Sequence, residues 1–122
     1  PRQALAVKLE CARIPHLRLI ASGSPEFDRG WIERAREETA DWLVRYDDPE
    51  WSEIVRTDHV DALRRLADSD LVVARFYRKV GNAPGAEHHA RRAVDEARDG
   101  GDEEQLRAAQ AFLEQLLAEQ GA

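Results

Sequence analysis

The stretch from Leu71 to Val94 constrains the fold most, because it reads as two helices joined by a short turn. Four side chains in its first half recur at spacings of three and four, as on one face of a helix: Val73, Ala74, Tyr77 and Val80. Gly81 and Asn82 predict the end of that helix, because glycine adopts the left-handed conformation of a helix end without steric penalty. Pro84 then predicts the first turn of a second helix, where its missing N–H costs little.

The second helix carries alanines at spacings of four, three and four, namely Ala86, Ala90, Ala93 and Ala97. A stripe this narrow allows neighbouring helices to pack closely. Tetratricopeptide repeats have a small residue, an aromatic residue three positions later and an alanine nine further on. Ala74, Tyr77 and Ala86 follow that order, with Ala93 seven beyond. We therefore expect an all-α fold of antiparallel helical hairpins, stacked as a tetratricopeptide-like solenoid with one long connecting helix.

The whole chain reads as a single helical-repeat domain of residues 1–122. Residues 1–24 are expected to form partial leading helices, and residues 25–80 a helix pair with a long second helix. Residues 81–122 are expected to form a repeat helix followed by a capping helix. In the helix pair, the apolar stripe of a first helix over Phe27–Tyr46 consists of Ile32, Ala35, Thr39, Trp42, Leu43 and Tyr46.

The long second helix is expected from Pro49 to Val80, because its apolar stripe scarcely breaks. Asp48 is the expected cap, with Pro49 in the first turn. The Asp68-Ser69-Asp70 segment is the weak point, since these residue types prefer caps and can restart a helix there. One unbroken helix and two helices both fit the sequence, and we favour one.

The last helix follows Gly100-Gly101, a strong stop signal. Asp102 is its expected cap, and Glu103 and Glu104 suit the positive end of the helix dipole. Its expected buried face consists of Leu106, Ala109, Leu113, Leu116 and Leu117, with Phe112 at the edge.

Composition and charge narrow the function. The chain is 43% hydrophobic and 34% charged, as is typical of a soluble amphipathic helical protein. Its net charge of −6 argues against nucleic acid as a partner, because phosphate binding needs a positive surface. Acidic pairs occur at helix ends or on polar faces, without a recognisable nucleophile, phosphate loop or metal motif beside them. We therefore expect no enzyme and no cofactor.

A basic island stands out in this acidic chain. Between Leu71 and Gly81 lie Arg75, Arg78 and Lys79 with no acidic residue, whereas residues 81–122 carry four basic and nine acidic groups. On the repeat pattern, Leu71 and the three cations lie on the exposed concave side, where such repeats hold peptides. The arginine fork suits a partner carboxylate. The alternative is a solvated helix face whose cations lie near the helix C-terminus.

Two adjacent histidines, His88 and His89, are the remaining candidates for partner binding. Neighbouring residues on a helix point about 100° apart, and no cysteine or carboxylate completes a ligand set at the usual spacing. We therefore expect no metal. At a docking surface, either histidine would make binding pH-sensitive.

The segment Asp61–Val94 resembles the outer-membrane β-barrel-assembly lipoproteins of the BamD/ComL-like family. The residues that carry the resemblance are, in order, Leu66-Ala67, Val73-Ala74, Phe76-Tyr77, Arg78-Lys79 and Gly81, and upstream Ala35, Trp42, Leu43 and Tyr46. The resemblance covers roughly residues 27–120.

This resemblance implies a bacterial, periplasmic scaffold of tandem helical repeats that docks other envelope assembly components or peptide segments at the outer membrane. The chain begins at Pro1 and has no methionine, so we expect a processed piece. Membrane association would then run only through an amino-terminal lipid anchor that is missing from this piece. A second copy of the chain is a further candidate partner. The alternatives are a general cytoplasmic tetratricopeptide adaptor and an accessory helical domain of a larger enzyme.

Overall fold

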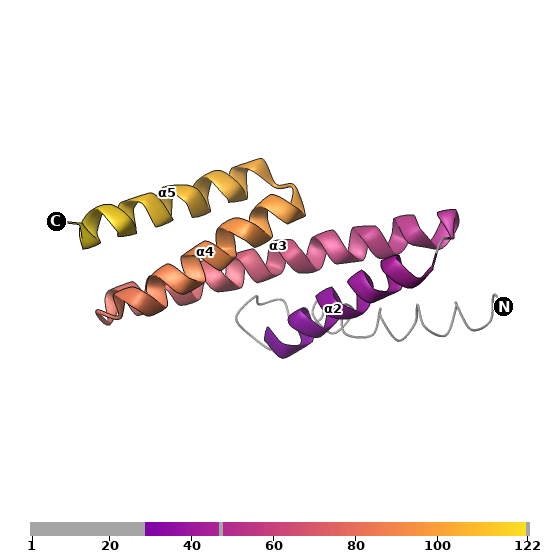
Figure 1. The fold of residues 1–122 in the computed structure, drawn as a ribbon, viewed down its shortest axis with the longest axis horizontal. Coiled ribbons are helices and arrows are strands. Elements are labelled where there is room, and N and C mark those ends of the chain that lie inside the picture. The colour runs from indigo at the N-terminus through magenta and orange to yellow at the C-terminus, as the bar shows by residue number, and fades with distance from the viewer. Residues whose placement is uncertain (1–28, 47, 122) are drawn as a thin grey trace. The chain divides into compact units, whose positions relative to one another are not determined.

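The computed structural model describes residues 29–121 except residue 47, and these residues form helices joined by short turns (Figure 1). The helices are α2 (Arg29–Arg45), α3 (Pro49–Lys79), α4 (Ala83–Gly100) and α5 (Glu103–Gln120). No strand occurs in this described part of the chain, so the all-α prediction is confirmed. The partial leading helices expected over residues 1–24 lie outside the described residues.

The fold divides into two compact units within α3, one up to Ala62 and the other from Leu63. In the first unit, α2 buries the predicted stripe, with Ile32, Ala35, Thr39 and Trp42 out of solvent. Trp42 and Val55 form its small core, and Thr39 Oγ1 lies 2.9 Å from His59 Nδ1. Asp48 Oδ1 accepts hydrogen bonds from the backbone N–H groups of Glu50 and Trp51, so Asp48 caps α3 as predicted.

Helix α3 runs unbroken through the predicted weak point. Its 31 residues span about 46 Å at the usual rise of 1.5 Å per residue. Ser69 and Asp70 do not act as caps, because both are buried on the helix face that packs inside the second unit. Asp70 instead pairs with side chains from α4, as described below. One long helix is therefore the correct alternative.

The turn between α3 and α4 has the predicted chemistry. Gly81 has a φ of +81°, in the left-handed region that favours glycine at a helix end. The Asn82 side chain accepts a hydrogen bond from the backbone N–H of Gly85, which caps α4. Val80, which we placed on the same helical face as Ala74 and Tyr77, directly follows the last residue of α3 and is 58% exposed. Helix α3 therefore ends one residue earlier than predicted.

Small residues allow α4 to lie directly against α3. The four alanines of the predicted stripe, Ala86, Ala90, Ala93 and Ala97, are completely buried. The close approach also requires glycine at position 85, because a Cβ there would lie 3.0 Å from Tyr77 Cγ. At the other end of α4, Arg64 Nε donates to the Gly100 carbonyl oxygen at 3.0 Å. The tight approach thus extends along the length of α4.

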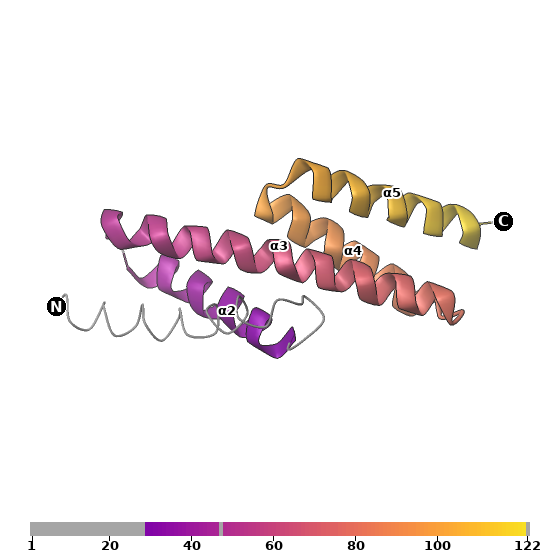
Figure 2. The ribbon, with the colours of Figure 1, turned by 180° about the vertical axis from the view of Figure 1, so that it is seen from behind.

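Helix α5 packs antiparallel to α4 and runs in the same direction as α3 (Figures 1 and 2). Asp102 caps it, since its carboxylate accepts from the backbone N–H of Gln105 at 3.0 Å. The expected roles of two side chains are reversed. Phe112, placed at the edge from sequence, is 8% exposed in the core, whereas Leu117 is 37% exposed. The buried face of α5 is therefore centred on Ala109, Phe112 and Leu116.

A test of the tight α3–α4 contact is Ala90→Leu. The larger side chain has no room in the completely buried stripe, so we expect the free energy of unfolding to fall by about 1–3 kcal/mol. Urea unfolding followed by circular dichroism measures the change. The matched control is Ala118→Leu on the exposed face of α5, which should stay within about 0.5 kcal/mol of the original protein. Equal midpoints for the two variants would contradict the packing.

Candidate docking groove between α3 and α5

A groove of about 640 Å³ lies between the last turns of α3 and the middle of α5. Arg75, Arg78 and Lys79 line it from α3, and Ala108, Ala111, Phe112 and Gln115 line it from α5. None of the α5 lining residues carries a charge. The groove is therefore a cationic wall facing a short uncharged wall, open to solvent between them.

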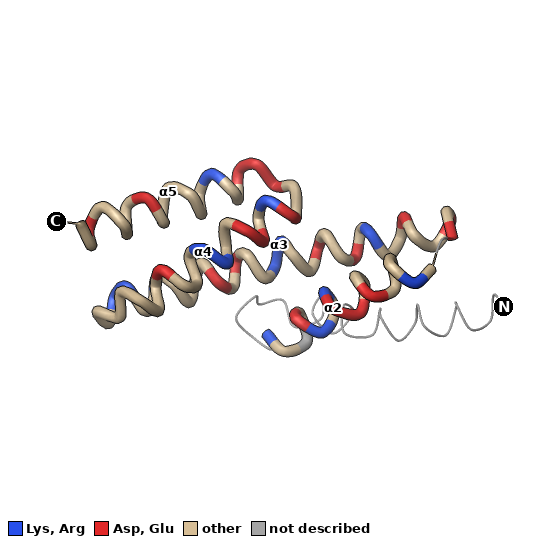
Figure 3. Tube along the Cα trace, in the orientation of Figure 1, with Lys and Arg blue, Asp and Glu red and all other residues tan. Residues whose placement is uncertain are grey.

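The spacing of residues explains both walls. Residues 75, 78 and 79 lie within one turn of each other on α3, so all three cations point to the same side. On α5, small or uncharged residues recur at 108, 111 and 115, at spacings of three and four. The charges of the two helices differ accordingly, with basic residues near the end of α3 and mostly acidic ones along α5 (Figure 3).

The three cations differ in their contacts with the rest of the protein. Arg75 and Lys79 are exposed and have no ion-pair partner among the residues that the structure describes. The Arg78 guanidinium carbon lies 5.5 Å from the centre of the Phe112 ring, within the range of a cation–π contact. Arg78 Nη2 also lies 3.6 Å from Glu119 Oε1, and both side chains are partly exposed. Arg78 is therefore held in place while its two neighbours extend into solvent.

Leu71 is not part of this exposed surface. We expected it beside the three cations on the concave side, but it is 8% exposed and belongs to the core. It lies one helical turn before Arg75, where α3 is still covered within its unit. The surface prediction for Leu71 was therefore wrong, whereas Arg75, Arg78 and Lys79 do lie together on an accessible face.

The two histidines lie on α4, away from the groove lining. His88 is exposed and meets the ring of His89 edge-on, with centroids 5.1 Å apart. The His89 ring stacks on Tyr77 at 5.5 Å and its Nδ1–H donates to Asp70 Oδ1 at 2.7 Å. His89 therefore has a structural role between α3 and α4.

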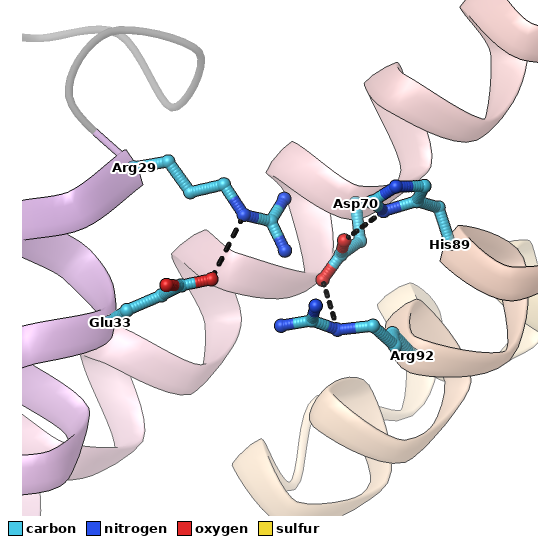
Figure 4. A network of polar contacts seen from close by, with 5 residues as sticks. All are labelled: Arg29, Glu33, Asp70, His89 and Arg92. Atoms are coloured by element: carbon cyan, nitrogen blue, oxygen red, sulfur yellow. Dashed lines mark hydrogen bonds and ion pairs between the residues drawn. The ribbon is translucent and has the colours of Figure 1, made fainter. Parts of the chain in front are cut away.

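Asp70 is the centre of a buried polar network (Figure 4). Its side chain is completely buried. Asp70 Oδ1 lies 2.7 Å from His89 Nδ1, and Asp70 Oδ2 lies 3.7 Å from Arg92 Nε, with both partners on α4. A buried carboxylate is costly unless it is paired and hydrogen-bonded, so these contacts fix α4 against α3 at one register. Figure 4 also shows Arg29 and Glu33 of α2, whose Nε and Oε1 atoms lie 3.1 Å apart on successive turns of that helix.

Sequence reasoning missed this network although a signal was present. Asp70 falls on the apolar stripe of α3, three residues after Ala67 and four before Ala74. An acid at such a position requires a partner, and His89 and Arg92 recur three apart beside the alanine stripe of α4. We considered Asp70 only as part of a possible break in the helix, because its residue type favours caps, and that view overlooked its position on the stripe.

A smaller hollow of about 260 Å³ adjoins the same arginine. Its lining consists of Arg78, Gly81, Ala83, Leu116, Glu119 and Gln120. Arg78 therefore borders both this hollow and the groove, and Glu119 approaches it from the side of the hollow.

Within the described residues, no group of three or more histidine, cysteine, aspartate or glutamate side chains is arranged to hold a metal ion. None of the described helices is both long and apolar enough to span a membrane. Chemically, the groove offers three cationic donors and a shallow uncharged wall. These features suit binding of an anionic, partly apolar chain.

Comparisons of the chain with protein-family models, curated proteins and solved structures gave no match.

The buried network is tested by Asp70→Asn. This change keeps the size of the side chain but removes the charge that pairs with His89 and Arg92, so the free energy of unfolding should fall by about 1.5–3 kcal/mol. Chemical denaturation measures it. Asp99→Asn, at an exposed position near the end of α4, removes the same charge and should change stability by less than about 0.5 kcal/mol. A loss no larger than that of the control would contradict the role of Asp70.

Proposed function

We propose that this chain is a non-catalytic protein-docking module that holds an acidic peptide segment of a partner protein in the α3–α5 groove. The observation that carries the proposal is the cationic wall of Arg75, Arg78 and Lys79 in a chain of net charge −6. Two of the three cations have no ion pair with another described residue, so their charges are available to a ligand.

The opposite wall supports a peptide ligand. Ala108, Ala111 and Gln115 are exposed and uncharged, and the side chains are small enough to leave space for a chain beside α5. A free anion would need only the cations, whereas a peptide also uses apolar contact along the groove. Charge pairs at such a rim mainly guide association and set specificity, and the uncharged wall adds buried area.

The helical hairpins support the tetratricopeptide-like interpretation of the fold. In that interpretation, α3 and α5 are the first helices of successive hairpins, which is where such repeats hold peptides. The BamD/ComL-like resemblance further suggests a partner in outer-membrane protein assembly, on the periplasmic side of that membrane. Arg78 and Lys79 belong to the segment that carries the resemblance and also line the groove. The same two residues therefore support both the docking groove and the outer-membrane setting.

The test is the binding of a fluorescein-labelled peptide of alternating glutamate and leucine, measured by fluorescence anisotropy. Arg75→Gln/Lys79→Gln removes two available cations, and we expect affinity to fall about tenfold or more at physiological salt. A peptide with glutamine in place of glutamate should bind weakly to the original protein.

The matched control is Arg56→Gln/Arg107→Gln, which makes the same change in net charge at exposed positions outside the groove. It should lower affinity only slightly, because distant charges are screened by salt. Equal losses for the two double variants, or equal binding of the glutamine peptide, would exclude this groove as the docking site.

A further inference from the structure

We infer that Glu119 is a built-in competitor for the acidic ligand of the groove. This inference rests on the proposed function and concerns the regulation of the same site. Glu119 Oε1 lies 3.6 Å from Arg78 Nη2, so a carboxylate of the chain itself already occupies one side of the central cation of the groove.

The geometry of Arg78 makes it the point of competition. Its guanidinium is held over the Phe112 ring and borders the groove on one side and the smaller hollow on the other. Glu119 approaches from the hollow, and a ligand carboxylate would approach from the groove. Two carboxylates at one guanidinium repel each other, so binding of the ligand weakens the Glu119 contact and the reverse is equally true.

The Glu119 contact is weak enough to yield. At 3.6 Å the atoms are farther apart than in a hydrogen bond, and both side chains are more than a third exposed. An ion pair of this kind contributes little to stability. Glu119 thus shields Arg78 in the absence of a ligand without closing the site.

Arg75 and Lys79 have no such internal partner in the described part of the chain. They are the groove cations that a ligand meets without competition, while Arg78 responds only to a ligand acidic enough to compete with Glu119. The Arg78–Glu119 pair therefore makes the groove prefer strongly acidic segments over weakly acidic ones.

The experiment compares Glu119→Gln with Glu114→Gln, using the glutamate–leucine peptide and the full chain. Both variants remove one negative charge from α5, but Glu114 lines a different surface hollow, between α4 and α5. We expect Glu119→Gln to bind about two- to fivefold more tightly than Glu114→Gln, as removal of a weak competing ion pair predicts. The gain should vanish in an Arg78→Gln background and for the glutamine peptide.

The outcomes separate this inference from the proposed function. Binding that depends on Arg75 and Lys79 but is equal for the two glutamate variants would overturn the competition and leave the docking site standing. A gain that survives in the Arg78→Gln background would also overturn it. Absence of binding by every variant, Glu119→Gln included, would overturn both proposals. Binding seen only after Glu119→Gln would support the competition in its strongest form.

Discussion

The close approach of α4 to α3 is the constraint on which the second unit depends. Four completely buried alanines and Gly85 keep the side chains on one stripe of α4 small enough for this approach. A polar network at Asp70 also lies in this contact, because the buried carboxylate accepts a hydrogen bond from His89 and lies 3.7 Å from Arg92 Nε, both on α4. Small residues thus permit the contact, and the carboxylate selects one register for it.

That register decides where the groove lies. Helix α4 positions α5, because the two form an antiparallel pair, and α5 provides the uncharged wall that faces the cations of α3. A helix face that is merely basic in sequence becomes one side of a hollow only through this arrangement. Phe112 links the core and the groove, since it belongs to the core cluster and also lies under Arg78.

Local chemistry predicted most of the helix boundaries. Asp48, Gly81, Asn82 and Asp102 act within a few residues of themselves, so their effects could be read from the sequence. The location of Arg75, Arg78 and Lys79 on one accessible face followed from helical spacing. Helical spacing did not predict the burial of Leu71 and Phe112 or the exposure of Leu117, because these depend on the angle at which α5 meets its neighbours. The Asp70 network was not predicted for a similar reason, since the partners of Asp70 come from another helix.

The two faces of α5 have different tolerances for change. Ala109 and Leu116 are locked into the core, whereas Ala108, Ala111 and Gln115 meet only the groove and solvent. Substitution at the second set alters the shape and polarity of the groove at little cost in stability. The lining of the groove can therefore vary while the scaffold stays unchanged, except at Phe112, where any change alters both.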